Sequence, residues 1–203
     1  MGSNMPKEIL DAMKVAKKSS PSPIKIWKSP EAGRTYIIGA DPGLGNADGG
    51  RSAIEVIDAE TGEQCAEYAG YVGPVALAPM ILELAKLYNS AEVAVEVNSF
   101  GMVTNNLLIR KFEYENIYRY KHLDRVNHSM TDIMGWWTNA KTMRQMTAVF
   151  VETVTKTPRL IRSQKLMEEI LNYEEDGFAH NDRLMAFMIA LAVRGEKLTA
   201  VAA

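Results

Sequence analysis

Three carboxylates stand at comparable places in the chain, and they are the residues best suited to chemistry. Asp41 ends one apolar run, Glu96 ends another, and Asp182 opens an amphipathic segment after a Gly-Phe-Ala-His-Asn loop. Strand ends on one side of an α/β sheet converge, and ligands bind at that edge. Three carboxylates gathered there would repel one another unless hard cations held them, and oxygen-only ligation suits Mg²⁺ or Mn²⁺.

Two such ions about 4 Å apart activate a water molecule and stabilise the leaving oxygen in phosphodiester cleavage. The sequence has no cluster of cysteine or histidine residues, which argues against zinc. Purely structural interpretations remain open. Asp41 lies in an Asp-Pro-Gly turn, and Asp182 is placed to cap its own helix, a role worth about 1 kcal/mol.

The elements around the three acids follow from hydrophobic periodicity. Strands are predicted at 34–40, 52–59 and 63–72, joined by short turns as an antiparallel meander, and then at 91–95 and 117–120. Helices are predicted from Pro74 or Pro79 to Tyr88 and, further along, at 98–114, 142–155, 163–172 and 182–194, with Ser163 as an N-cap. The pattern indicates an α/β fold with a central mixed sheet of about five or more strands, flanked by helices.

The ends of the chain differ from this core. Residues 1–33 comprise a Met-Gly-Ser remnant, a short helix at 6–18 and a Pro/Ser-rich linker or wrapping arm at 19–33. The core domain is expected at 34–195, and 196–203 is expected to be a frayed tail.

Composition limits the classes of function. The 203 residues are 47% hydrophobic and 24% charged, as in a globular protein, and no apolar run is long enough to cross a membrane. Cys65 is the single cysteine, so an internal disulfide is excluded, and a buried structural thiol in a reducing compartment is the favoured interpretation. The formal net charge of −2 argues against binding nucleic acid through overall charge, but leaves room for a local basic groove.

An ordered set of segments resembles a known family. The segments are GADPGLG with Asp41, AEVAVEVN with Glu96, GWWTNAKTMRQM, and HNDRLMAFMIALA with Asp182. Together, over about residues 34–195, they resemble the nuclease domain of the phage terminase large subunit, which has a ribonuclease H-like fold. Carried over by position, the resemblance implies that Asp41, Glu96 and Asp182 are catalytic residues and ligands of two Mg²⁺ or Mn²⁺ ions.

The resemblance also implies a biological setting. It predicts an endonuclease that cuts double-stranded concatemeric viral DNA during genome packaging, in the cytoplasm of the infected bacterial host. The expected partners are DNA, an N-terminal packaging ATPase domain, the portal and the small terminase subunit. No GxxxxGK[ST] phosphate loop occurs in these residues, so we interpret the chain as an excised C-terminal domain.

One departure from the family concerns the last acidic motif. The family often has two adjacent aspartates there, whereas Asn181 precedes Asp182 in this chain. An amide adds no charge, so the second metal is expected to bind more weakly. Asp48 and His180 are further accessory candidates, and the surface acids that could compensate are Glu174, Glu175 and Asp176.

The candidates for DNA contact are basic residues in the second half of the chain. Arg183 is favoured because it adjoins a proposed ligand, and phosphate rather than base contacts are expected. The other candidates are Lys141, Arg144, Lys156, Arg159, Arg162 and Lys165. Of the adjacent Trp136 and Trp137, one is expected in the core and one as a lid at the sheet edge, with base stacking as the alternative.

Other functions fit the same acids. A junction resolvase or an RNA:DNA hybrid nuclease would use them in the same way, and a non-catalytic docking domain would use them to bind a basic partner. An actin-like sugar kinase or ATPase also begins with an Asp-Gly hairpin, but it needs a second phosphate-binding hairpin and a longer chain, so it ranks last.

Overall fold

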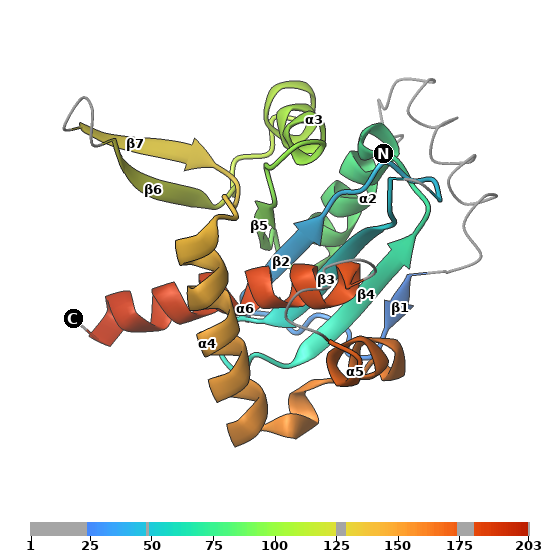
Figure 1. Cartoon of the computed structure of the whole chain (residues 1–203), viewed down its shortest axis with the longest axis vertical. Coiled ribbons are helices and arrows are strands. Elements are labelled where there is room, and N and C mark those ends of the chain that lie inside the picture. The colour runs from blue at the N-terminus through green and yellow to red at the C-terminus, as the bar shows by residue number, and fades with distance from the viewer. Residues whose placement is uncertain (1–23, 48, 125–128, 174–180, 203) are drawn as a thin grey trace.

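The computed structural model describes residues 24–47, 49–124, 129–173 and 181–202. Its centre is a five-stranded sheet in the order β1-β4-β3-β2-β5 (Figure 1). Strand β5 is parallel to β2, and all the other neighbours are antiparallel. The strands are β1 (Lys25–Ile26), β2 (Tyr36–Asp41), β3 (Ser52–Asp58), β4 (Gln64–Gly70) and β5 (Glu92–Val95). The mixed α/β sheet is therefore confirmed, with the meander in β2 to β4 and the parallel strand in β5.

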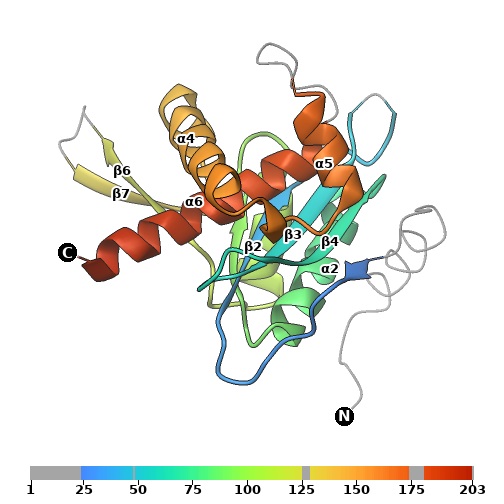
Figure 2. The ribbon, with the colours of Figure 1, turned by 90° about the horizontal axis from the view of Figure 1, so that it is seen from below.

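Helices cover both faces of this sheet (Figure 2). One face packs against α2 (Pro74–Leu87), which begins at Pro74 and carries Pro79 inside it. The other face packs against α6 (Asp182–Ala202), with α4 (Ala140–Lys156) and α5 (Gln164–Leu171) beside that helix. Ser163 caps α5 as predicted, because its hydroxyl accepts a hydrogen bond from Leu166 N at 3.1 Å. The result is a three-layer α/β/α arrangement.

The alternation of side chains along β2 determines which of its residues contact α6. On β2, Ile38 and Ala40 belong to the apolar cluster with α2, whereas Ile37 belongs to the cluster with α6. Gly39 shares the α6 face, and a Cβ built there would lie 2.0 Å from the carbonyl oxygen of Ala186. Helix α6 therefore rests almost directly on the backbone of β2, and only glycine permits this approach at position 39.

Two predicted elements differ in the structure. The strand expected at 117–120 is β6 (Arg119–Asp124), which pairs with β7 (Ser129–Met134) in a separate two-stranded sheet projecting from the body. Isolated bridges link this region to the main sheet, from Val93 to Ile117 and from Glu96 to Trp136. The hairpin escaped prediction because those of its side chains that the structure describes are exposed or only half-buried, so the sequence shows no clear apolar alternation. The helix expected at 98–114 is a short α3 (Gly101–Asn106) followed by a π-helical turn, η1 (Leu107–Lys111).

The two ends of the described chain also differ from prediction. Part of the expected linker is ordered against the sheet edge, where β1 pairs with β4 and Trp27 N donates to Cys65 O at 2.9 Å. The expected tail from residue 196 continues α6 to Ala202. The helix predicted at 6–18 lies outside the described residues. Within the described part of the chain, no helix has the length and apolar character to cross a membrane.

Candidate metal centre

The backbone brings Asp41 and Glu96 together. Asp41 is the last residue of β2, and Glu96 directly follows β5, its parallel neighbour. Glu96 N donates to Ala40 O at 2.9 Å, which continues the pairing of the two strands by one step. Since Gly39 pairs with Ala94, residues two further along each strand point to the same face, the one covered by α6. The two carboxyl groups therefore share one corner of the sheet.

The third acid reaches this corner from α6. Asp182 is the first residue of the helix, whose first turns lie over the end of β2. Asp182 is not needed as the cap of its own helix, because Glu169 of α5 takes that role. Glu169 Oε2 accepts hydrogen bonds from Arg183 N at 3.0 Å and Leu184 N at 3.1 Å.

The surroundings of Asp41 disfavour the charged form of its carboxyl group. Burial, followed by the negative charges of Glu96 and Asp182, raises the pKa of Asp41 well above the ordinary carboxyl value. A hydrogen bond with Glu96 and the charge of Glu169 add to this rise. Among the described residues, no Lys, Arg or His forms an ion pair with Asp41 or Glu96. In the described part of the chain, the negative charge on this half of the corner is therefore not neutralised.

The other half is neutralised by Arg51, which directly precedes β3. Arg51 Nε lies 2.9 Å from Asp182 Oδ2, and Arg51 Nη2 lies 3.1 Å from Glu169 Oε1. In the described part of the chain, no group of three or more acidic, histidine or cysteine side chains is gathered tightly enough to hold a metal ion as it stands. Instead, Arg51 binds Asp182, while Asp41 and Glu96 share a side-chain hydrogen bond.

The donor chemistry nevertheless fits a hard divalent cation. Every candidate ligand is a carboxylate oxygen, and the Asp41–Glu96 pair is an excess of negative charge in a half-buried site. Burying such charge without a partner is costly, and a bound cation would offset that cost. Asp41 and Glu96 would hold the ion, with Asp182 as the third ligand.

Arg183, the favoured candidate for DNA contact, is held in buried ion pairs. Its side chain is buried, at 6% exposure, and forms ion pairs with Glu67 at 3.1 Å and Glu169 at 2.8 Å. Below it, Glu67 pairs across the strands with Glu55, which accepts a hydrogen bond from Gln64 at 2.7 Å. Contact with a phosphate would require breaking both ion pairs, so the predicted DNA contact of Arg183 has no support in this structure.

The remaining basic candidates lie at the surface. Lys141 and Arg144 are exposed on α4, and Arg144 lines an apolar groove of about 800 Å³ with Met143 and Val151. Arg162 is half exposed and bonds Glu63, with Arg162 Nε to Glu63 Oε1 at 3.1 Å. The structure leaves these three as candidates for phosphate contact.

The tryptophan pair divides as expected. Trp136 is fully buried beside Tyr118, whereas Trp137 is 41% exposed. The segment that follows is tied to the metal corner, because Asn98 and Thr138 exchange hydrogen bonds of 2.7 and 3.0 Å. Trp137 therefore lies beside the strand end that carries Glu96.

The other predicted residues have simpler outcomes. Asn181 is buried immediately before Asp182, and its carbonyl oxygen accepts from Met185 N at 2.9 Å, as part of the first turn of α6. Cys65 is buried and free, as predicted, and burial raises the pKa of its thiol to about 12. Asp48, His180 and the acids at 174–176 lie outside the described residues.

Sequence reasoning missed two residues of this corner, Arg51 and Glu169. Arg51 is two positions before Ala53, the cross-strand partner of Asp41, so strand alternation already placed it on the same face. Glu169 stands three residues after the buried Leu166 on α5, which puts a carboxylate on the inner side of the helix. In both cases, the sequence signal for a site residue was a charged residue at a position that the periodicity assigns to a buried face.

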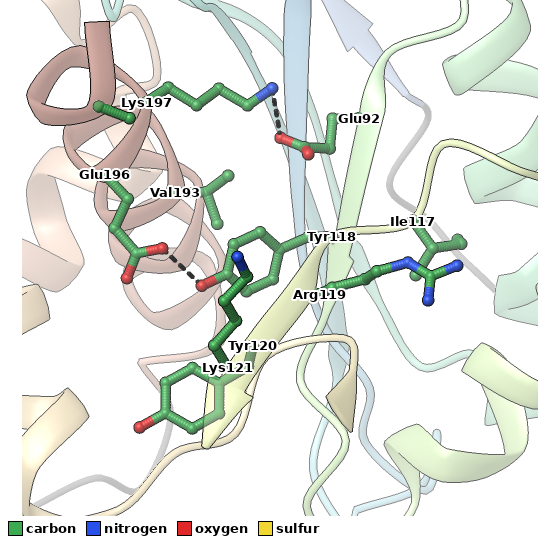
Figure 3. Close-up of a pocket in the computed structure, with 10 residues that line it drawn as sticks. Glu92, Ile117, Tyr118, Arg119, Tyr120, Lys121, Val193, Glu196 and Lys197 are labelled. Atoms are coloured by element: carbon green, nitrogen blue, oxygen red, sulfur yellow. Dashed lines mark hydrogen bonds and ion pairs between the residues drawn. The ribbon is translucent and has the colours of Figure 1, made fainter. Parts of the chain in front are cut away.

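A separate cavity of about 440 Å³ lies at the opposite end of β5 (Figure 3). In it, Lys197 pairs with Glu92 at 3.0 Å, and the Tyr118 hydroxyl donates to Glu196 at 2.7 Å. Glu92 begins the strand that Glu96 follows, so this cavity is distinct from the metal corner. Lys197 and Glu92 neutralise each other there, and Glu196 accepts hydrogen bonds from Tyr118 and Gln145.

Comparison with known proteins rests on structure alone, since no family model and no curated protein matches the sequence. The large terminase nuclease of the thermophilic phage G20c, solved with bound magnesium, aligns with a TM-score of 0.59 at 15% identity, over 83% of this chain and 86% of that one. The chain has the fold of the large terminase nucleases.

Two further terminase nuclease domains share this fold. The domain from Thermus phage P74-26 aligns with a TM-score of 0.53 at 16% identity, over 82% of this chain and 83% of that one. The human cytomegalovirus domain aligns with a TM-score of 0.51 at 15% identity, over 94% and 98% of the two chains. The predicted fold, that of a large terminase nuclease domain, is therefore confirmed.

Proposed function

We propose that this protein is a metal-dependent endonuclease that cuts double-stranded concatemeric DNA during viral genome packaging. The observation that carries the proposal is the Asp41–Glu96 pair, which no cation among the described residues neutralises, at a sheet corner that Asp182 approaches from α6. Carboxylates without a paired cation are suited to bind divalent metal, and DNA cleavage by metal-activated water is chemistry that such ions support.

The proteins of similar fold agree with this assignment. The G20c terminase nuclease has been solved with bound zinc, magnesium or cobalt, and the cytomegalovirus domain after a manganese soak with an inhibitor bound. For this chain we propose Mg²⁺ or Mn²⁺, with two ions in the cleaving state. When bound, these ions supply an activated water and a Lewis acid for the leaving oxygen.

In this proposal the acidic residues have different roles in holding the metal. Asp41 and Glu96 hold the metal through oxygen atoms on strands that the sheet keeps rigid, which suits a site that requires fixed geometry. Asp182 completes the ligand set from α6, and Glu169 fixes the first turn of that helix. The carboxylates also lower the local potential, so DNA phosphates approach only once metal has offset that charge.

Surface groups beside the corner would guide the DNA. Lys141 is exposed on the first turn of α4, just after Thr138, which bonds Asn98 close to Glu96. The exposed Trp137 lies on the same connection. A cation and an aromatic ring here would contact backbone phosphate and sugar or base with little sequence preference.

Plasmid cleavage with Mn²⁺ tests the proposal. We expect Asp41→Asn, Glu96→Gln and Asp182→Asn each to lower the rate by about 100-fold or more, because each removes a charged ligand. Glu83→Gln, at an exposed site on α2, is the matched control and should cleave like the parent. Parental activity in any of the three variants would remove that residue from the mechanism.

The substrate needs a separate comparison. Linear duplex, four-way junction and RNA:DNA hybrid, offered at equal concentration, distinguish a packaging endonuclease from a junction resolvase or a hybrid nuclease that would use the same acids. Calorimetry with Mn²⁺ addresses the non-catalytic alternative, because a docking domain would bind a partner without binding metal.

The setting is part of the same proposal. We propose that the protein works in the cytoplasm of an infected bacterium, together with a packaging ATPase domain, the portal and the small terminase subunit. Co-purification of a tagged copy from infected cells, with and without packaging in progress, would test these partners.

A further inference from the structure

Arg51 is bound by two carboxylates at the edge of the proposed metal centre. Its Nε donates to Asp182 Oδ2 at 2.9 Å, and its Nη2 donates to Glu169 Oε1 at 3.1 Å. The three side chains are mostly buried, with 25%, 16% and 10% of their surfaces exposed for Arg51, Asp182 and Glu169. Ion pairs in such places are screened far less than pairs at the surface.

Glu169 holds Arg51 in place and has no oxygen to spare for a metal ion. Its Oε2 accepts from Arg183 N and Leu184 N, and its Oε1 accepts from Arg183 Nη1 at 2.8 Å and from Arg51. A carboxylate has about four acceptor positions, and all are used here. Glu169 is thus an anchor that joins Arg51 to the first turn of α6.

The charges of the corner are therefore divided unequally. Asp182 and Glu169 face two guanidinium groups, those of Arg51 and Arg183. Asp41 and Glu96 face none among the described residues. A first divalent ion gains most at the Asp41–Glu96 pair, whereas an ion that ligates Asp182 meets the positive charge of Arg51.

We propose that Arg51 is a built-in cation that occupies Asp182 in the resting protein, so that the second divalent ion binds only when Arg51 leaves this carboxylate. The inference rests on the proposed metal-dependent function and deepens it. The free protein then holds one ion tightly, on Asp41 and Glu96. Arg51 remains attached to Glu169 when it leaves Asp182, so the exchange needs only a change of its own side chain.

Calorimetric titration with Mn²⁺, together with counting of bound Mn²⁺ by electron paramagnetic resonance, tests this proposal. The parent should bind one ion tightly, and a second ion at least about tenfold more weakly, because of the adjacent guanidinium charge. Arg51→Met should bind two ions with affinities within about tenfold of each other. Arg51→Lys, which keeps the charge, should behave like the parent.

Arg34→Met is the matched control. Arg34 also bridges two carboxylates, with its Nε 2.7 Å from Asp58 and its Nη1 3.3 Å from Glu60, and it has the same 25% exposure. It lies away from the metal corner, so its loss should leave the count of bound ions at the parental value. A second tight ion in Arg34→Met would show that general charge, and not Arg51, sets the count.

A measurement on the parent covers the case in which Arg51→Met does not fold. The ¹⁵N resonance of Arg51 Nε, assigned through Arg51→Lys, should stay in place over the first equivalent of Mg²⁺ and move only as the second ion binds. Movement with the first equivalent would overturn the proposal, as would two equally tight ions in the parent or a single ion in folded Arg51→Met. No bound metal in the parent would instead overturn the proposed function itself.

Discussion

The contact between Gly39 and α6 gives the sharpest stability prediction. A Cβ at position 39 would lie 2.0 Å from Ala186 O and 2.8 Å from Ala190 N, two backbone atoms one helical turn apart. Side-chain carbons do not approach closer than 3.0 Å, so Gly39→Ala must move α6 away from β2 by about 1 Å. No rotamer change can relieve this contact, because neither atom belongs to a side chain.

The expected cost of Gly39→Ala follows from this displacement. Overpacking a core typically costs about 1–3 kcal/mol, and a clash with rigid backbone belongs at the upper end, about 3 kcal/mol. For a chain of this size, 1 kcal/mol corresponds to about 2–4 °C in Tm, so we expect a fall of about 6–12 °C. Differential scanning calorimetry in the presence of EDTA measures this without any contribution from metal binding.

Gly195→Ala, in the same helix, is the matched control. A Cβ at that position would meet only side-chain atoms of Val149, at 3.5 and 3.6 Å, which is ordinary contact. Replacing glycine by alanine inside a helix stabilises by about 0.5–1 kcal/mol, so this variant should melt slightly higher than the parent. A Gly39→Ala protein that melts at the parental temperature would refute the packing described for α6.

The same substitution should also affect the proposed chemistry. Helix α6 carries Asp182 opposite Asp41 on β2, and a shift of about 1 Å between reacting groups lowers rates by up to about 100-fold. Cleavage by Gly39→Ala, measured below its melting temperature, should therefore fall much further than its folded fraction does. Parental cleavage by the folded variant would show that the position of α6 does not set the site.

Three further predictions concern buried charge and hydrogen bonding. Because the pKa of Asp41 is raised in the folded protein, protonation of this carboxyl group favours folding; the stability gained is complete below the ordinary carboxyl pKa and is lost as pH rises through the raised pKa. Without metal, Asp41→Asn should therefore melt about 3 °C higher than the parent at neutral pH but at the same temperature at pH 4. Added Mn²⁺ should remove the difference at neutral pH. Arg183→Met leaves Glu67, which is 2% exposed, without its cation, and should lower the free energy of unfolding by about 3–5 kcal/mol in urea titrations. Arg162→Met, at a half-exposed ion pair, should lower it by about 1 kcal/mol or less. Equal losses in the two variants would contradict the argument from burial. Gln64→Leu removes the acceptor of two backbone N–H groups, at residues 162 and 163, and should lower the free energy of unfolding by about 2–4 kcal/mol in the same titration. A loss below about 1 kcal/mol would rule out a structural role for the Gln64 side chain.

The parts of the fold that sequence could predict are those with a strong local pattern. Strands β2 to β5 and helix α6 bury one or both faces, so apolar periodicity marks them clearly. The hairpin β6–β7 and the π-helical turn η1 lack such a pattern. Their conformations depend on pairing and packing that a single sequence does not reveal.

The candidate site was predictable in part for a similar reason. Strand ends and a helix start placed Asp41, Glu96 and Asp182 at one sheet edge, because topology alone determines where those ends lie. Side-chain pairing was not predictable in the same way. Arg183 adjoins Asp182 in sequence, yet the 100° step between neighbouring helical residues turns it under the helix, toward Glu67.

The pattern of charges beneath α6 separates the candidate site from the structural ion pairs around it. Helix α6 supplies cations that pair with acids on the sheet: the buried Arg183 pairs with Glu67, and the half-exposed Lys197 pairs with Glu92. Where the helix lies over Asp41 and Glu96, it offers Asp182 instead. Among the described residues, this corner therefore adds a further acid where two sheet acids have no paired cation, and the one nearby guanidinium, that of Arg51, is bound to Asp182 and Glu169. That local excess of acids, and not the number of acids in the chain, is the physical reason to propose a metal centre there.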